Sequence, residues 1–221
     1  MLTLSASSIL NYARCPYSFY LYKTTEREEK PQTKATATGR AFHRLIGFIL
    51  NGMSFKEALD EVLIDDILAD AQELKMFYSV YEEELERLKD EGVLATEKYF
   101  ELDIDGVIIS GYIDIITSFR RLIEMKTTRQ QIQAPKPSHI FQVSLYRLTD
   151  DADSYELHYI SPAQLVKIPV KPYPSSLVLS IVKQVKTLVD TLEYPPLGLV
   201  NGYCQYCLYK SLCTYYQKVE V

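Results

Sequence analysis

The chain has 221 residues, of which 47% are hydrophobic and 24% are charged, as expected for a globular protein with one well-buried core. No apolar stretch approaches membrane-spanning length, and the N-terminus has no basic segment before an apolar run, so we expect a cytoplasmic protein with no membrane partner. The net charge of −5 argues against a protein that coats nucleic acid indiscriminately.

The charge is unevenly distributed along the chain. Residues 52–105 hold 17 acidic and 5 basic side chains, whereas the remainder holds 12 acidic and 19 basic ones. The basic remainder is the part that could meet phosphates. The alternative is that the acidic segment is simply the solvated face of helices.

The N-terminal segment from Ser5 to Lys23 is predicted to be helical, with Ser5 as N-cap and a break at Cys15-Pro16. It is rich in aromatic residues: Tyr12, Tyr17, Phe19, Tyr20 and Tyr22. These rings could stack on bases, but aromatic residues at helical spacing more often pack internally. The polar residues 24–38 are interpreted as a connection or lid.

Two helical regions are predicted next. The first runs from Ala37 to Leu50 and ends at Asn51-Gly52; Gly39 and His43 lie four residues apart on one of its faces, which lets a backbone or a metal approach the imidazole. The second, opened by a capping box of Ser54 and Glu57, is one long helix or a pair of helices to about Lys89.

A three-stranded antiparallel meander is predicted after Gly92. Its strands are 93–104, 107–117 and 122–126, and Asp105-Gly106 is a strong signal for the first hairpin turn. If the second hairpin is symmetric about Phe119, Asp114 and Glu124 lie opposite each other, about 4.5 to 5.5 Å apart at Cβ.

Two carboxylates at that separation repel unless a positive charge lies between them. Mg²⁺ and Mn²⁺ prefer carboxylate and water oxygens, so Asp114 and Glu124 form a plausible half-site, with Lys126 on the same face to act on an attacking water or a phosphate. The alternative is a solvent-facing strand with ordinary surface ion pairs.

The rest of the globular part alternates again between helix and strand. A helix from Pro137 to about Leu148 places His139, Gln142 and Tyr146 on one face. The further predicted elements are strands at 155–160 and 164–170 and an amphipathic helix at 174–193, followed by Pro195-Pro196.

Four cysteines could form one metal site. Cys204, Cys207 and Cys213 have the spacing C-x2-C-x5-C, and Cys15 is the only other cysteine. Such thiolate sets bind Zn²⁺ or an iron-sulfur cluster, and ligand type alone does not separate the two. Free buried thiols are the alternative.

These motifs together carry a resemblance to a known family. Gly39 with His43, Gly111-x-x-Asp114, Glu124-x-Lys126 and Gln142-x3-Tyr146 occur in that order, bracketed by the four cysteines. Over nearly the whole chain this resembles the CRISPR-associated RecB-like nucleases of the PD-(D/E)XK superfamily.

The resemblance implies an α/β fold with a mixed sheet, a PD-(D/E)XK restriction-endonuclease-like core. It also implies three parts: a helical segment at 1–36 that supplies one cluster cysteine, a nuclease domain at 37–196 with a helical insertion at about 54–90, and a cluster segment at 197–221.

By the same resemblance, His43, Asp114, Glu124 and the Met125 carbonyl bind Mn²⁺ or Mg²⁺, and Lys126 acts on the attacking water. Gln142 and Tyr146 match the QxxxY motif, which orients the active site or contacts the DNA backbone. Cys15, Cys204, Cys207 and Cys213 match iron-sulfur ligands, so a cluster is favoured over zinc, 4Fe-4S ahead of 2Fe-2S.

The implied function is a metal-dependent exonuclease acting on single-stranded DNA ends, which processes new spacers beside the CRISPR integrase proteins. Two alternatives remain open. One is a repair or helicase-associated nuclease of the same fold, and the other is a non-catalytic, zinc-containing DNA-binding adaptor.

Overall fold

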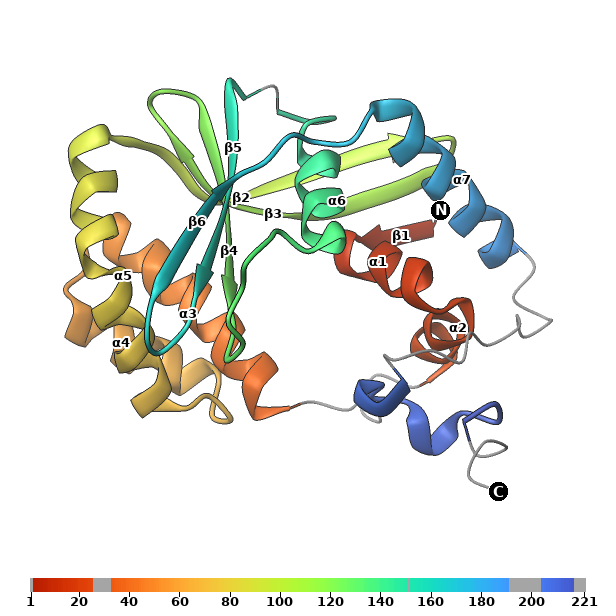
Figure 1. Cartoon of the computed structure of the whole chain (residues 1–221), viewed down its shortest axis with the longest axis horizontal. Coiled ribbons are helices and arrows are strands. Elements are labelled where there is room, and N and C mark those ends of the chain that lie inside the picture. Colours follow the sequence, from red (N-terminus) through yellow and green to blue (C-terminus); the bar gives the residue numbers. More distant parts are fainter. Residues whose placement is uncertain (1, 26–32, 151, 191–203, 217–221) are drawn as a thin grey trace. The chain divides into compact units, whose positions relative to one another are not determined.

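The computed structural model describes residues 2–25, 33–150, 152–190 and 204–216 (Figure 1). The strands are β1 (Leu2–Ser5), β2 (Val93–Ile104), β3 (Val107–Thr117), β4 (Arg121–Thr127), β5 (Ser154–Ile160) and β6 (Leu165–Pro169). The helices are α1 (Ala6–Arg14), α2 (Pro16–Thr24), α3 (Lys34–Leu50), α4 (Phe55–Asp65), α5 (Ala71–Glu91), α6 (Pro137–Tyr146) and α7 (Ser175–Asp190), followed by the short 3₁₀ turns η2 (Cys204–Tyr206) and η3 (Lys210–Leu212). No described helix combines the length and apolar composition needed to cross a membrane.

The sheet is mixed, as predicted. Its order is β1-β3-β4-β5-β6, with β2 also paired to β3. The β1–β3 and β4–β5 pairs are parallel, whereas β3–β4 and β5–β6 are antiparallel. The parallel β4–β5 pair is connected by α6, since two parallel neighbours need a crossover. The predicted α/β class with a mixed sheet is therefore confirmed.

The chain divides into two compact units. Unit 1 comprises residues 1–31, 101–110 and 173–221, and unit 2 comprises residues 32–100 and 111–172. In unit 2, α3, α4 and α5 pack against the sheet (Figure 1), and their apolar residues form one buried core with Ile115, Ile123, Met125 and Ile160. The domain boundaries predicted at 36 and 196 stay a prediction.

Local sequence signals account for the turns. Asp105 and Gly106 both have positive φ, 52° and 83°, the geometry of the tight hairpin turn that joins β2 to β3. Gly92 ends α5 at φ 84°, where a Cβ would lie 2.6 Å from Ser118 Oγ, so only glycine fits without a shift. The capping box of Ser54 and Glu57 at the start of α4 is confirmed.

Several predicted boundaries differ from the observed ones. Residues 2–5 form a strand that was not predicted. Ser5, at its end, caps α1 by accepting a hydrogen bond from the Ser8 amide. Helix α3 begins at Lys34 because Thr33 caps it, so residues 34–38 are not part of a connection. The region predicted as one long helix or a pair of helices to about Lys89 forms two helices, α4 and α5. Helix α6 ends at Tyr146 instead of about Leu148. Residues 26–32 of the predicted lid, and Pro195-Pro196, lie outside the described residues.

Candidate active site

The predicted catalytic hairpin forms with the expected register. Ile115 pairs with Ile123 and Ile116 with Leu122, as a hairpin centred on Phe119 requires. Beyond these pairs, the Met125 amide donates a 2.6 Å hydrogen bond to Asp114 Oδ2. One oxygen of the aspartate is thereby fixed by the neighbouring strand.

Both hairpin carboxylates are buried. Asp114 is 5% exposed and Glu124 is 1% exposed. Exposed surface pairs would not be desolvated in this way, so the alternative of a solvent-facing strand with ordinary ion pairs is wrong. Burial of charged side chains is costly unless they are paired or bind a cation, so the partners of these two carboxylates decide what this part of unit 2 can do.

Helix α3 adds an imidazole to the hairpin. His43 Nδ1 lies 3.0 Å from Asp114 Oδ1. The neighbouring turn of α3 carries Gly39, where a Cβ would lie only 3.1 Å from Thr127 Oγ1 on β4, so a side chain there would require Thr127 to shift. The predicted pairing of a glycine with a histidine one turn later therefore has a packing reason.

Helix α6 adds an amide and a phenol on the Glu124 side. The Lys126 ammonium donates to Glu124 Oε1 and, at 3.0 Å, to Gln142 Oε1. The Tyr146 hydroxyl donates to Glu124 Oε2 at 2.8 Å and accepts from Gln142 Nε2 at 2.5 Å. Gln142 thus bridges Lys126 and Tyr146, and both oxygens of Glu124 have a donor.

The ionisation of the site follows from burial and from these contacts. Burial and the charge of Asp114 raise the pKa of Glu124 to about 7. Burial disfavours the charged forms of His43 and Asp114 as well, but their mutual attraction outweighs it, so the pKa of His43 is raised and that of Asp114 is lowered. For Lys126, the charges of Glu124 and Asp114 outweigh burial and raise the pKa.

One residue of the site was missed by sequence reasoning. That residue is Glu97, which can offer a metal-ligand atom together with His43 and Asp114. The three ligand atoms lie within 4.8 Å of one another, and the described ranges contain no other such group of three or more metal-binding side chains. Glu97 lies as far before the Asp105-Gly106 turn as Asp114 lies after it. Counting back from that turn could have found it.

The donor set fits a divalent cation. One imidazole and two carboxylates, with water or phosphate oxygens to complete the shell, suit Mg²⁺ or Mn²⁺. Glu124 does not belong to this compact group, and its oxygens are taken by Lys126 and Tyr146. The predicted ligand roles of Glu124 and the Met125 carbonyl stay predictions.

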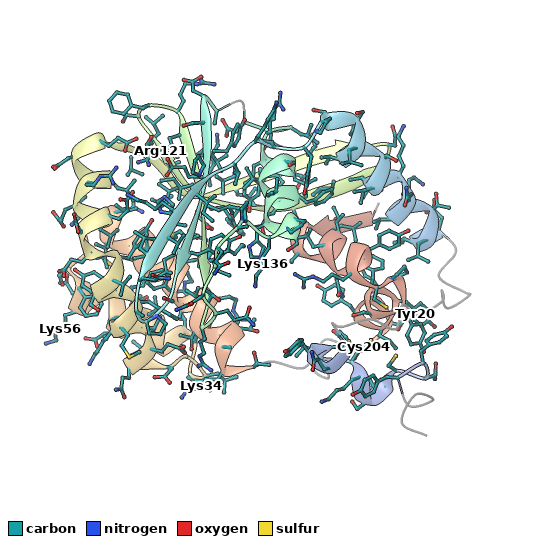
Figure 2. All side chains as sticks on the ribbon, in the orientation of Figure 1. Tyr20, Lys34, Lys56, Arg121, Lys136 and Cys204 are labelled. Atoms are coloured by element: carbon teal, nitrogen blue, oxygen red, sulfur yellow. The ribbon has the colours of Figure 1, made fainter. Side chains whose placement is uncertain are left out.

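All four cysteines belong to unit 1 and are partly buried. Cys15 is the residue between α1 and α2, and Ser18 Oγ on α2 lies 3.7 Å from Cys207 Sγ; Tyr20 and Cys204 mark these segments in Figure 2. No three cysteine sulfurs in the described ranges lie within 4.8 Å of one another. The cluster they were predicted to bind therefore stays a proposal.

The aromatic residues of α2 favour the packing interpretation. Tyr17 and Phe19 are buried, at 7% and 0% exposed. Tyr17 stacks on Tyr20 at 5.7 Å between ring centroids and meets the edge of Tyr215 at 4.9 Å. These rings hold α2 against the C-terminal segment within unit 1.

Comparison with known proteins agrees with this geometry. The model of the PD-(D/E)XK nuclease superfamily matches residues 3–214. A search of curated proteins gave no match. A crystal structure from Eubacterium rectale, described as that of a presumed exonuclease, aligns over 99% of this chain and 88% of its own with a TM-score of 0.61 and 10% identity, which supports the fold alone.

Two other solved structures align less well. The crystal structure of SSO0001 covers 95% of this chain and 96% of its own, with 18% identity and a TM-score of 0.46. That of LHK-Exo in complex with dAMP covers 72% of this chain and 91% of its own, with 14% identity and a TM-score of 0.40. The superfamily match spans nearly the whole chain, including every residue of the hairpin site, and the chain therefore belongs to the PD-(D/E)XK nuclease superfamily.

Proposed function

We propose that this chain is a metal-dependent DNA exonuclease that hydrolyses phosphodiester bonds at single-stranded DNA ends and serves CRISPR adaptation. The observation that carries the proposal is the buried hairpin, where Asp114, Glu124 and Lys126 meet His43 from α3. Nucleases of this superfamily use divalent metal ions. Membership of the superfamily does not specify the single-stranded substrate or the CRISPR role. These parts of the proposal are supported by the ordered motifs that resemble the CRISPR-associated RecB-like nucleases.

His43 and Asp114 would hold the divalent cation, with Glu124 completing the predicted ligand set. A cation bound there supplies charge neutralisation on the phosphate and makes water a stronger nucleophile at neutral pH. Because Asp114 has a lowered pKa, its carboxylate is charged and ready to bind a cation at neutral pH. Glu124, with a pKa of about 7, is only partly charged at neutral pH, and a cation bound beside it would favour the charged form.

Lys126 is placed to serve the chemistry rather than the cation. Its ammonium, whose pKa is raised, donates to Glu124 and to Gln142 and is held in one position by both. A fixed positive charge beside the carboxylates can orient the attacking water and stabilise negative charge developing on the phosphate.

Gln142 and Tyr146 act as positioning residues in this proposal. Tyr146 is 1% exposed, and burial together with the charge of Glu124 raises the pKa of its hydroxyl well above the ordinary value, so it stays a donor to Glu124. A ring this deeply buried supports the orienting role of the QxxxY motif more than contact with the DNA backbone.

The four cysteines are proposed to bind an iron-sulfur cluster, 4Fe-4S ahead of 2Fe-2S, that stabilises unit 1. Their thiolates are suitable donors, and Ser18, three residues after Cys15, lies beside Cys207.

The activity is tested with end-labelled single-stranded DNA, its circular form and the matching duplex. We expect cleavage of the linear single strand, none of the circle, and complete loss with EDTA. Mn²⁺ should restore activity at least as well as Mg²⁺, since imidazole is a softer ligand than carboxylate, and Ca²⁺ should not, because its looser geometry does not align the water. Cutting of the circle would contradict an exonuclease, and cutting in EDTA would contradict metal dependence.

The cluster is tested separately by visible absorption and iron analysis of anaerobically purified protein. Cys15→Ala should bleach the protein and lower its thermal stability, because the cluster would close a loop between residues near the two ends of the chain. A variant that stays brown and equally stable would contradict the proposed ligand set. The CRISPR role is tested by the genes beside this one: integrase genes support it, and repair or helicase genes favour the alternative nuclease.

A further inference from the structure

Glu97 has an unusual backbone for a residue inside a strand. It lies within β2 with φ 47°, in the left-handed region that non-glycine residues rarely adopt. Strained backbone of this kind persists only where the surroundings impose it, and it gathers at functional sites. The strain is a reason to ask what the Glu97 side chain does.

The side chain lies against the helix that carries His43. A Cβ added to Gly47, one turn after His43 on α3, would lie 3.6 Å from Glu97 Cγ. That distance is an ordinary van der Waals contact, so α3 and β2 lie against each other at this point. The Glu97 side chain therefore lies against the face of α3 that also carries His43.

The carboxylate of Glu97 is short of positive partners. Its Oε1 atom is buried and makes no hydrogen bond within the described ranges. Burial and the charge of Asp114 raise the pKa of Glu97, while His43 and Arg44 oppose the rise. The guanidinium of Arg44 is paired with Asp65.

We infer that Glu97 is a further ligand of the divalent cation, at the end of the site formed by His43 and Asp114. The inference rests on the proposed metal-dependent function and adds a ligand to it. Three ligand atoms within 4.8 Å of one another, one of them on a carboxylate with a buried, unsatisfied oxygen, form a donor set that a cation would complete. Without a cation, the negative charges of Glu97 and Asp114 oppose each other.

The test is Glu97→Gln, which keeps the shape and removes the charge. Isothermal titration with MnCl₂ should show binding weakened by at least about tenfold, because loss of even an outer-shell partner costs about 10- to 100-fold in metal affinity. Thermal unfolding in EDTA should show a variant at least as stable as the wild type, while the stabilisation on adding MnCl₂ should shrink. These opposite changes distinguish a ligand from a structural residue, whose loss would lower stability in EDTA.

Glu101→Gln is the matched control, since Glu101 lies on the same strand and is exposed. It should bind MnCl₂ like the wild type. Unchanged Mn²⁺ affinity in Glu97→Gln would overturn the inference, and so would a variant that loses stability in EDTA. Asp114→Asn separates the two proposals: if it loses Mn²⁺ binding while Glu97→Gln keeps it, only the role of Glu97 fails, whereas if both keep it, the proposed metal site fails.

Discussion

Unit 2 contains two clusters of charged side chains, each built around buried carboxylates, that differ in how their charges are balanced. The candidate-site cluster consists of His43, Glu97, Asp114, Glu124 and Lys126, in which three carboxylates face one ammonium and one imidazole. The α5 network consists of Glu84, Glu91 and Glu156 with Arg87, Arg121 and Lys167, so that three carboxylates face three cations; Arg121 is labelled in Figure 2.

The α5 network satisfies itself. Arg121 donates to Glu91 and, at 2.9 Å, to Glu156, while Glu84 Oε2 accepts from Arg87 and Lys167. Even the oxygen of Glu84 that makes no hydrogen bond lies 4.0 Å from the Arg121 guanidinium. A closed network of this kind joins α5 to β4, β5 and β6 and has no need of a further ion.

The candidate-site cluster is left with surplus negative charge. Its carboxylates raise the pKa values of Lys126 and His43 against the effect of burial, whereas burial and the charge of Asp114 together raise those of Glu97 and Glu124. The comparison teaches that burial of charge alone does not mark a site; a deficit of positive partners does. Four experiments test the distinction, beginning with the largest expected effect.

Asp114→Asn should lower the rate of DNA cleavage by at least about 10³-fold, comparable to loss of a main source of transition-state charge stabilisation. The variant loses a charged cation ligand and the partner of His43, yet it should fold, because it removes charge from an overcrowded cluster. Initial rates on end-labelled single-stranded DNA measure the loss, with circular dichroism as the folding check. Cleavage at the wild-type rate would mean that the hairpin is not the active site.

Arg121→Met should have the opposite profile. Breaking a balanced buried network leaves carboxylates unpaired, so the free energy of unfolding should fall by about 3–5 kcal/mol, measured by urea denaturation in EDTA. Mn²⁺ affinity of the folded variant should stay unchanged. The neighbouring Arg120 is exposed, and its ion pair with Asp153 at 3.9 Å lies on the surface, so Arg120→Met should cost no more than about 1 kcal/mol. Equal costs for the two variants would contradict the distinction.

Glu124→Gln should change how stability depends on pH. The pKa of Glu124 is about 7 in the folded protein against 4.5 ordinarily, so the unfolded chain releases this proton first as pH rises. The stability difference between wild type and variant should therefore shift by about 3 kcal/mol in favour of the variant between pH 4.5 and pH 7, and then level off. Urea denaturation in EDTA across this range measures it, and a flat difference curve would contradict the shift.

Tyr146→Phe should have the smallest effect, a fall in turnover of about tenfold with Mn²⁺ affinity nearly unchanged. The hydroxyl positions Glu124 through a single buried hydrogen bond, and losing such a bond costs about 1–3 kcal/mol. Calorimetry with MnCl₂ and cleavage rates together separate positioning from metal binding. Tyr78→Phe, which removes a surface hydrogen bond to Glu82, is the control. Loss of Mn²⁺ binding in Tyr146→Phe would contradict the positioning role.

Much of the fold could be predicted from the sequence because its signals are local. Strand β2 begins and ends where alternation predicted, since Asp105-Gly106 supplies both positive φ angles of a tight turn. The capping box at Ser54 and the glycine at position 92 likewise mark helix ends through contacts within a few residues. Helix α3 extends further than predicted, because the Thr33 cap lies among residues interpreted as a connection.

The hairpin site was within reach of the sequence for the same reason, because strand alternation and a symmetric turn place Asp114 and Glu124 on one face. Glu97 was not found, although it mirrors Asp114 across the Asp105-Gly106 turn. Its positive φ and its contact with α3 are set by packing, and a strand pattern does not reveal them. The burial of Tyr146 against Glu124 likewise depends on how α6 packs.

The sequence by itself determined the hairpin turn at Asp105-Gly106, the capping box at Ser54, the order of the elements after β1 and the pairing of β3 with β4, since each rests on residues close together in the chain. Only the tertiary structure decided the parallel pairings of β1 with β3 and β4 with β5, and the balance of charge in each buried cluster. The sequence alone does not distinguish the carboxylate of Glu84 from that of Glu97, although each has one buried oxygen without a hydrogen bond in the described ranges. Whether it meets enough cations depends on side chains brought from distant segments by packing, and that balance separates a structural network from a metal site.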